Sequence, residues 1–259
     1  MEYRYPGVSL EKIIEIGGFR SLVYEPWREI PGLVQGVTVK PAAGMKKTAA
    51  DEVVRHFRRD GFAPAPRIRQ VHGKRVIVAS ALEDTAAGEA PEADGLACAR
   101  AGVLGLVSVA DCVPVFMVEP AQGAWALVHS GWRGTVAGAV ENGIERLEEL
   151  TGSTPDQFEL YFGPAVCGSC YEVGPEVARL LSGAAAGAGI IERSGRISAD
   201  LRVIQKARAV SRGVRPANIQ ISSFCTICHN DRFCSYRAEG AGAVRGMWAY
   251  LGRKDESRK

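Results

Sequence analysis

The sequence has only four histidines and no large excess of either charge. Its 259 residues carry a formal net charge of +3, which is too small to predict nucleic-acid binding. It also lacks an apolar run of the roughly 18 residues needed to span a bilayer. The longest apolar stretch, Val103–Val118, is interrupted by Ser108 and Asp111. We therefore expect no nucleic-acid partner and no membrane role.

A secretory signal is also missing from the start of the sequence, where no basic segment leads into an apolar stretch and a small-residue cleavage site. The seven cysteines are an odd number, which favours free thiols over a disulfide framework. These features predict a cytoplasmic protein. Because domains usually contain about 50–250 residues, we expect residues 1–259 to form a single domain.

Helical and strand-like patterns follow one another without a regular βαβ period, which favours an α+β fold with mixed sheets. Apolar residues at helical spacing predict helices over Ala49–Arg59 and Thr135–Leu150, with Thr135 as the N-cap of the second. Nearly continuous apolar runs are typical of strands buried on both faces. Such strands are expected at Val103–Val109, Pro114–Val118 and Trp125–Val128.

Two histidines share a context that suits a metal ligand. His72 lies at a tight turn between predicted strands over Arg67–Val71 and Lys74–Ala79, and His129 follows the strand that ends at Val128. A strand end before a glycine-containing turn directs a side chain to a fixed point and leaves room for a ligand. Either histidine alone is more often a structural residue than a ligand. Their shared setting favours ligation.

Cys112 is the third candidate ligand, in the kink between two predicted buried strands. One cysteine and two histidines suit zinc, with copper less favoured, and three protein ligands leave a fourth position open, as in catalytic zinc sites. Asp111, directly beside Cys112, must be paired or face a cavity, and could orient a ligand or bound water. The same residues also fit a thiol hydrolase with Cys112 as nucleophile and His129 or His72 as base, or a simple buried thiol.

A glycine-rich turn, Gly131–Gly134, leads into the second predicted helix. Backbone N–H groups and the helix dipole favour an anion there, and Arg133 could clamp a phosphate or carboxylate. The alternative is a plain connection between strand and helix with a surface arginine.

Two CxxC pairs are typical of a structural zinc site with four cysteine ligands. They are Cys167/Cys170 and Cys225/Cys228, separated by more than fifty residues, unlike the compact spacing of a zinc ribbon. The sequence leaves open whether they bind a second metal or are reduced thiols in a pocket or core.

Several segments, in order over about residues 70–240, resemble the YfiH-type laccase-domain family, also called multicopper polyphenol oxidoreductases. These segments are Gln70–Gly73, Ala93–Leu96, Ala110–Val115, Val128–Thr135, Gly163–Val166 with Cys170–Gly174, Asp200–Leu201, and Cys225–Thr226 followed by Ser235–Arg237. No single segment is diagnostic, but their combination in this order is specific.

The resemblance implies a four-layer α/β/β/α sandwich with zinc bound by His72, Cys112 and His129. It also implies phosphorolysis of purine nucleosides (adenosine, inosine, guanosine or methylthioadenosine), with adenosine deamination as a companion activity. Arg237 matches the first arginine of the family's Ser-Tyr-Arg-Arg segment and is expected at the substrate or phosphate. We accordingly expect Cys112, Asp111 and Arg237 in catalysis, and Gln70 and Arg133 in substrate or phosphate binding.

The sequence departs from the family pattern near its end. Ala238 stands where a second arginine is usual, Cys234 stands where an aromatic residue is usual, and Gly240–Gly246 matches poorly. A polyphenol oxidase is not expected, because its copper centres need many more than four histidines. The alternatives are an amidase or peptidoglycan-editing hydrolase that uses Cys112 or zinc, and a zinc-stabilised interaction module without turnover. The preferred nucleoside and the oligomeric state are not predicted.

Overall fold

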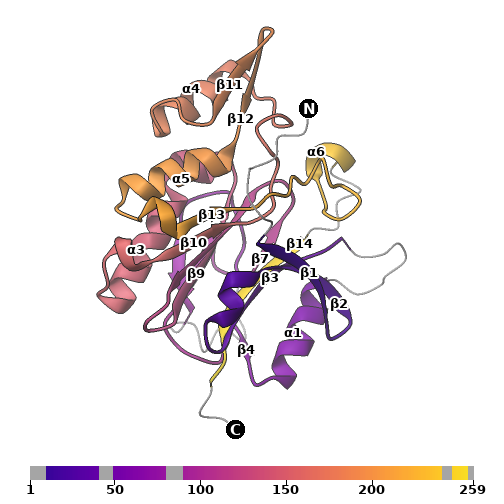
Figure 1. Cartoon of the computed structure of the whole chain (residues 1–259), viewed down its shortest axis with the longest axis vertical. Coiled ribbons are helices and arrows are strands. Elements are labelled where there is room, and N and C mark those ends of the chain that lie inside the picture. The colour runs from indigo at the N-terminus through magenta and orange to yellow at the C-terminus, as the bar shows by residue number, and fades with distance from the viewer. Residues whose placement is uncertain (1–9, 41–48, 80–89, 241–246, 256–259) are drawn as a thin grey trace.

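Two six-stranded sheets form the centre of the molecule in the computed structural model of the chain, which describes residues 10–40, 49–79, 90–240 and 247–255 (Figure 1). The first sheet has the strand order β1 (Glu11–Ile16), β2 (Phe19–Tyr24), β3 (Leu33–Thr38), β14 (Met247–Arg253), β7 (Val103–Val109) and β4 (Ala63–Pro64). The second has the order β13 (Ile219–Ile221), β10 (Glu159–Phe162), β8 (Val113–Glu119), β9 (Ala124–Ser130), β6 (Gly95–Cys98) and β5 (Val76–Val78). Each sheet combines parallel and antiparallel pairs, which confirms the predicted mixed sheets.

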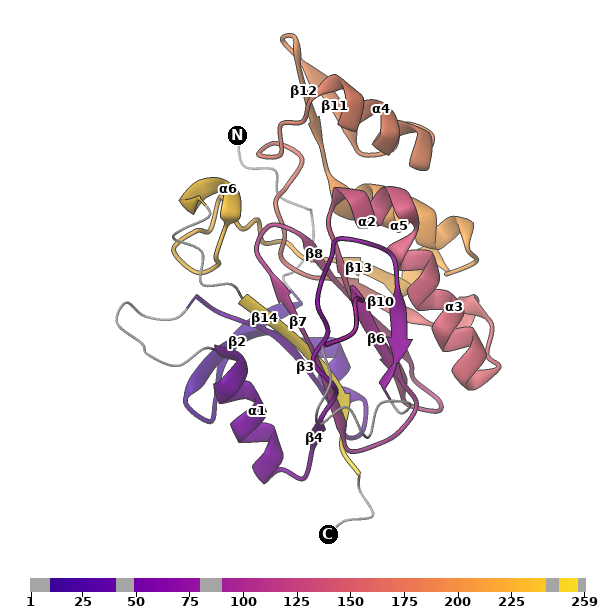
Figure 2. The same ribbon diagram turned by 180° about the vertical axis from the view of Figure 1, so that it is seen from behind.

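The helices lie outside the two sheets, on opposite sides. They are α1 (Ala49–Arg59), α2 (Trp132–Ala137), α3 (Ala139–Thr151), α4 (Pro175–Ala184), α5 (Leu201–Ser211) and α6 (Tyr236–Glu239). A separate hairpin is formed by β11 (Ile190–Arg193) and β12 (Arg196–Ala199), and 3₁₀ turns occur at Glu25–Glu29, Pro155–Gln157 and Pro216–Asn218. Figure 2 shows α1 on the opposite side of the sheets from α2, α3 and α5.

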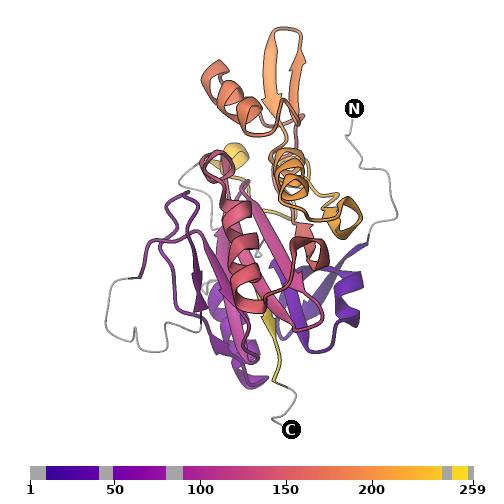
Figure 3. The same ribbon diagram turned by 90° about the vertical axis from the view of Figure 1, so that its left-hand side faces the viewer.

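Three apolar cores separate four layers. Val53 and Phe57 of α1 pack with Tyr250 on the outer face of the first sheet. A second core fills the space between the sheets, where Val107 of β7 and Trp125 of β9 belong to the same cluster. The third core lies between the second sheet and α3, α4 and α5, and Figure 3 shows α3 in front of that sheet. The four-layer α/β/β/α sandwich is thereby confirmed.

Strands β8 and β9 are the central pair of the second sheet and are buried along their whole length. Both of their faces contact a core, one toward the first sheet and one toward the helices. This position explains their almost continuous apolar sequences, because a strand covered on both faces has no solvent-facing positions to fill with polar residues. The predicted strands over Val103–Val109, Pro114–Val118 and Trp125–Val128 are confirmed.

Two predictions of secondary structure need correction. The helix expected over Thr135–Leu150 is two helices, because Gly138 has a φ of 92° and ends α2. Thr135 is therefore not an N-cap; it lies inside α2, and its hydroxyl donates to the carbonyl of Gly131 over 2.9 Å. No regular strand forms over residues 67–71 in the described chain, where Arg69 makes a single bridge to Glu92.

The helices of the described residues are too short or too polar to span a lipid bilayer. The predicted helix over Ala49–Arg59 is confirmed with the same bounds. Of the poorly matching segment Gly240–Gly246, residues 241–246 lie outside the described part of the chain.

Candidate active site and metal centre

The three predicted metal ligands come together, each from a different element. His72 lies in the segment before β5, Cys112 in the turn that connects β7 to β8, and His129 in β9. One ligand atom from each residue lies within 4.8 Å of the other two. The pairing of β8 with β9, with Pro114 opposite His129, accounts for the approach of Cys112 to His129. The two imidazole rings are 4.8 Å apart, edge to face.

The backbone is left-handed at two positions of this site. His72 has a φ of 59° and Asp111 has a φ of 80°. Residues other than glycine rarely adopt such angles, and the cost of about 1–3 kcal/mol is tolerated where surrounding contacts enforce the conformation. Here the contacts come from two carboxylates, Asp94 and Asp111 itself.

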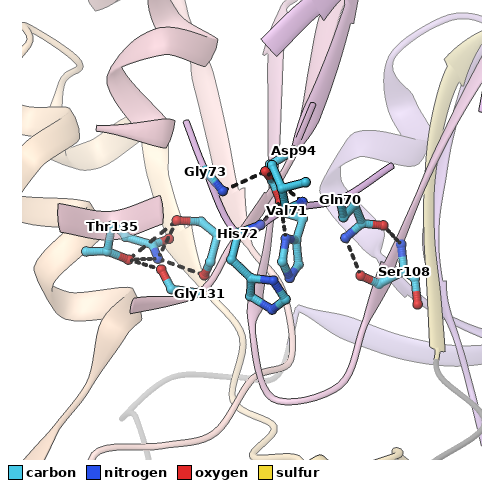
Figure 4. Close-up of polar contacts among 11 residues, drawn as sticks. Gln70, Val71, His72, Gly73, Asp94, Ser108, Gly131 and Thr135 are labelled. Atoms are coloured by element: carbon cyan, nitrogen blue, oxygen red, sulfur yellow. Dashed lines mark hydrogen bonds and ion pairs between the residues drawn. The ribbon is translucent and has the colours of Figure 1, made fainter. Parts of the chain in front are cut away.

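Asp94 contacts both candidate histidine ligands, a role that the sequence patterns did not predict. Its side chain is fully buried directly before β6. It accepts backbone N–H bonds from Val71 (3.2 Å), His72 (2.9 Å) and Gly73 (2.6 Å), and Figure 4 shows its carboxylate facing this segment. Its Oδ1 is also 2.9 Å from Nδ1 of His129. This contact leaves the other ring nitrogen of His129 for a metal, the usual arrangement of a ligand histidine.

Hydrogen bonds within the site shift two pKa values. Burial raises the pKa of the Cys112 thiol, but hydrogen bonds and charge from His129 and His72 outweigh it and bring the pKa down to about 7. Burial lowers the pKa of His129, but bonds to Asp94 and Cys112 outweigh it and raise the pKa to about 9. Between pH 7 and pH 9, the metal-free site therefore contains the Cys112 thiolate beside the His129 imidazolium.

Asp111 contacts the opposite wall of the site rather than a ligand side chain. Its Oδ1 accepts a bond of 2.6 Å from the hydroxyl of Thr226, and its Oδ2 accepts a bond of 2.8 Å from the backbone N–H of Arg237. Its backbone carbonyl accepts from Val166 N over 3.1 Å. The expected requirement for partners is met, and the orienting role toward a ligand belongs to Asp94. A catalytic part for Asp111 stays a prediction.

A pocket of about 630 Å³ opens over the three ligands, a volume suited to a small-molecule substrate. Asp111, Arg133 and Arg237 line it together with Trp132 and Tyr171. Both arginines are exposed, and each guanidinium lies over an aromatic ring: Arg133 over Trp132 at 4.4 Å and Arg237 over Tyr171 at 4.8 Å. The structure thus brings both predicted anion-binding residues to the same pocket as the candidate metal centre.

Gln70 also lines the pocket, but both ends of its amide contact the backbone of Ser108 (Figure 4). Its Nε2 donates to the Ser108 carbonyl over 2.9 Å, and its Oε1 accepts from the Ser108 N–H over 2.8 Å. These bonds connect the His72 segment to β7. They fix the segment in place, and the expected contact of Gln70 with substrate stays a prediction.

Gly131 packs directly against the candidate metal centre. A Cβ atom at this position would lie 2.7 Å from Sγ of Cys112 and 3.4 Å from the His72 ring. Only glycine fits without displacing the sulfur atom. The segment is fixed to α5 by Gln205, whose Nε2 donates to the Ser130 carbonyl over 3.2 Å and to the Thr135 hydroxyl over 2.7 Å.

The two CxxC pairs also converge, although they are far apart in sequence. Sulfur atoms of Cys167, Cys170, Cys225 and Cys228 all lie within 4.8 Å of one another. Among the described residues, the four form the second group of side chains that could hold a metal ion, and none of the seven cysteines is in a disulfide.

Comparison with known proteins agrees with this geometry. Residues 42–251 match the family model described as multi-copper polyphenol oxidoreductase laccase. The chain belongs to this family. It is 35% identical over 199 residues to a purine nucleoside phosphorylase of Deinococcus radiodurans, a match covering 76% of this chain and 72% of the relative. It is 34% identical over 186 residues to adenosine deaminase RL5 of an unknown prokaryotic organism, covering 68% and 71%.

A solved structure extends the likeness to the fold. The crystal structure of YlmD from Geobacillus stearothermophilus superposes with a TM-score of 0.80 at 26% identity, covering 96% of this chain and 100% of that one. The resemblance inferred from the ordered segments is therefore confirmed, and the described core of the chain has the family's architecture.

Proposed function

We propose that this laccase-type chain is a zinc-dependent purine nucleoside phosphorylase that also deaminates adenosine. One observation carries the proposal: a two-histidine, one-cysteine centre lies at the base of a pocket edged by two arginines. Relatives covering most of the chain are named purine nucleoside phosphorylase and adenosine deaminase. The chain is an enzyme of this kind, acting on adenosine, inosine, guanosine or methylthioadenosine.

The donor set fits zinc. Two imidazoles and one thiolate are zinc ligands, and a set of three leaves one coordination position for a reactant. A cysteine nucleophile needs only one base and one orienting group, for which His129 and Asp94 would suffice. The presence of His72 in the same cluster favours a metal centre over a cysteine nucleophile assisted by His129 and Asp94. When bound, zinc supplies Lewis acidity toward an oxygen atom and makes water more acidic.

Phosphate binding is assigned to Arg133 and Arg237. Guanidinium groups suit phosphate because their parallel N–H donors match two oxygens at once. Arg237 is fixed by a bond of 3.1 Å from one terminal nitrogen to the Glu172 carbonyl and by the Tyr171 ring beneath it. A guanidinium has five donors, so this bond leaves others for an anion. The arginines would hold phosphate for attack at the anomeric carbon and offset its charge.

The aromatic wall of the pocket suits a purine base. The rings of Trp132 and Tyr171 lie beneath the guanidinium groups of the two arginines. Tyr236 also lines the pocket, with 55% of its surface exposed. An exposed ring beside a pocket can stack on a planar heterocycle. Positioning of the nucleoside against phosphate and electrostatic compensation supply most of the rate of phosphorolysis in this scheme.

The activity is tested by incubating zinc-loaded protein with adenosine, with and without phosphate, and identifying the products by chromatography. Adenine with ribose 1-phosphate only when phosphate is present is the expected result, with some inosine in both samples. Inosine alone would reduce the function to deamination. Turnover of muropeptide precursors without any nucleoside turnover would contradict the proposal and favour the amidase alternative.

The arginine assignment has its own test. Arg133→Ala and Arg237→Ala should each raise the KM for phosphate about tenfold or more, because a charge-assisted hydrogen bond contributes about 1.5–3 kcal/mol. Arg215→Ala is the matched control, since Arg215 is exposed and pairs with Asp156 outside the pocket. An unchanged KM for phosphate in both variants would remove the arginines from the phosphate site.

A further inference from the structure

The four cysteines of the CxxC pairs occupy two loops that meet beside the candidate active site. Cys167 and Cys170 lie in the loop between β10 and α4, and Cys225 and Cys228 lie between β13 and α6. Sγ of Cys170 and Sγ of Cys228 are 3.5 Å apart, and all four sulfurs fall within 4.8 Å of one another. A tetrahedral zinc ion with bonds of about 2.3 Å requires sulfur atoms about 3.8 Å apart. The 3.5 Å separation and the 4.8 Å upper limit fall on either side of this value.

The backbone of both loops is arranged around the sulfurs. Sγ of Cys225 accepts N–H bonds from Cys167 over 3.3 Å and from Cys228 over 3.5 Å. The N–H of Cys170 donates to the Cys167 carbonyl over 2.9 Å and closes a tight turn that brings this pair together. N–H donors directed at sulfur stabilise a thiolate, the form that binds metal.

Packing of apolar thiols explains the cluster poorly. Cys167 and Cys225 are buried, but Cys170 is half-buried and Cys228 is exposed. An exposed thiol at a core-like cluster gains little from burial, whereas a metal ion requires all four sulfurs whatever their exposure. A site with four protein ligands and no open position is typical of structural rather than catalytic zinc.

We propose that Cys167, Cys170, Cys225 and Cys228 bind one structural zinc ion, separate from the centre formed by His72, Cys112 and His129. The ion would join the loop after β10 to the loop after β13. Val166 and Tyr171 of the first loop line the active-site pocket, and the second loop leads into α6, whose Tyr236 and Arg237 line it as well. The second metal would therefore act on the first site through the protein.

Three contacts connect the sulfur cluster to the first site. Thr226, next to Cys225, donates to Asp111 over 2.6 Å. Val166, next to Cys167, donates its N–H to the Asp111 carbonyl over 3.1 Å. Tyr171, next to Cys170, lies under the guanidinium of Arg237 at 4.8 Å. Because Asp111 precedes Cys112, loss of the structural ion should loosen the turn that carries a ligand of the first site.

Metal content separates the two sites. Wild-type protein purified without chelator should contain two zinc ions per chain by elemental analysis. Cys112→Ala should retain one, with four sulfur neighbours by X-ray absorption at the zinc edge. Cys170→Ser/Cys228→Ser, which changes the two less buried thiols, should also retain one, with mixed nitrogen and sulfur neighbours. Cys98→Ala is the control, since Cys98 is a buried thiol outside both groups, and it should retain two.

Several results would overturn the proposal. These are a Cys112→Ala protein without metal or with only nitrogen and oxygen neighbours, iron in place of zinc, or disulfides among the four cysteines by mass spectrometry. The Cys112→Ala measurement leaves all four cysteines intact, so it decides the question even if the double serine variant fails to fold. The result does not depend on which nucleoside, if any, the first site accepts.

The connection between the sites is measured in the double serine variant by chelator competition. Zinc affinity at the first site should fall about tenfold relative to Cys98→Ala, as expected when the support of a ligand is weakened. An unchanged affinity would contradict the connection through Asp111.

Discussion

At the scale of single residues, Asp94 is the shared support of His72 and His129, two of the candidate metal ligands. One oxygen contacts His129 and the His72 N–H, and the other accepts from Val71 and Gly73. In Asp94→Asn, an amide NH₂ would face either the imidazole or two N–H donors. We therefore expect the zinc affinity of the first site to fall by about 10–100-fold, measured by chelator competition. Asp156→Asn, at an exposed carboxylate, is the control; equal affinities in the two variants would contradict this role.

The protonation of Cys112 and His129 predicts how zinc binding depends on pH. Zinc needs a thiolate and a neutral imidazole. With the Cys112 pKa lowered to about 7 and the His129 pKa raised to about 9, binding displaces both protons below pH 7 and mainly the His129 proton between pH 7 and 9. Affinity should rise with pH up to about 9, and more steeply below pH 7.

The protons released can be counted by calorimetry in buffers of different ionisation enthalpy. The Cys170→Ser/Cys228→Ser variant isolates the first site. Cys112 and His129 together should release about two protons per zinc ion at pH 6 and about one at pH 8. The same number at both pH values would contradict the shifted pKa of Cys112.

At the scale of elements, the start of α2 determines how closely its backbone approaches the metal centre. The backbone of Gly131 (φ −81°, ψ −172°) suits alanine, but the added Cβ would lie 2.7 Å from Cys112 Sγ. Gly131→Ala should therefore fold normally but lose zinc from the first site. We expect its zinc content to fall by one ion per chain and the melting temperature of the metal-free protein to be unchanged. The reason is steric, because no backbone strain is introduced.

Gly174→Ala is a closely matched control for this prediction. Gly174 is also a helix N-cap with extended backbone (φ −71°, ψ 161°), and a Cβ there would meet no atom within 4 Å. It should keep full zinc content. A Gly131→Ala protein with the same zinc content as Gly174→Ala would show that the sulfur atom moves away without consequence.

Some helices and strands could be predicted from the apolar periodicity of the sequence, and others could not. Periodicity located α1 and the buried strands β7, β8 and β9, because burial on one or both faces leaves a local apolar pattern. It failed at residues 67–71, where polar groups replace a strand ladder: Asp94 accepts the Val71 N–H and Gln70 pairs with Ser108. It also missed the break at Gly138, a left-handed position that helical spacing does not reveal.

The three candidate ligands could be named from the sequence because residue type and strand-end context are local properties. Those properties left a thiol nucleophile equally open, and the ordered family segments favoured a metal site. Asp94 could not be assigned in this way, since its partners come from a distant segment. One signal was present: an aspartate between Ala93 and Gly95 in an otherwise apolar segment must be paired when buried. Convergence of the two CxxC pairs is likewise a property of the fold rather than of spacing.

At the scale of the whole molecule, a buried ion pair connects α5 to both sulfur-bearing loops. Arg202 contacts Asp200 over 3.2 Å and donates to the carbonyls of Ser222 (3.1 Å) and Phe224 (3.0 Å), while Asp200 accepts the Gly168 N–H. Arg202→Met would leave a buried carboxylate without its counter-charge. We expect the free energy of unfolding to fall by about 3–5 kcal/mol in urea titration.

Arg215→Met serves as the comparison for this loss. The Arg215–Asp156 pair is exposed, and such pairs contribute about 0–1 kcal/mol. A change of similar size in the two variants would mean that the buried pair does not stabilise the arrangement of the loops.

In the proposed function, the centre formed by His72, Cys112 and His129 is required for phosphorolysis of purine nucleosides. Its most direct test is the rate of adenine release from adenosine in phosphate, measured as zinc is added back to metal-free protein and to Cys112→Ala. The wild-type rate should rise in proportion to occupancy of the first site, and Cys112→Ala should stay inactive while it retains zinc at the sulfur cluster. Full phosphate-dependent turnover by metal-free protein or by Cys112→Ala would contradict the claim.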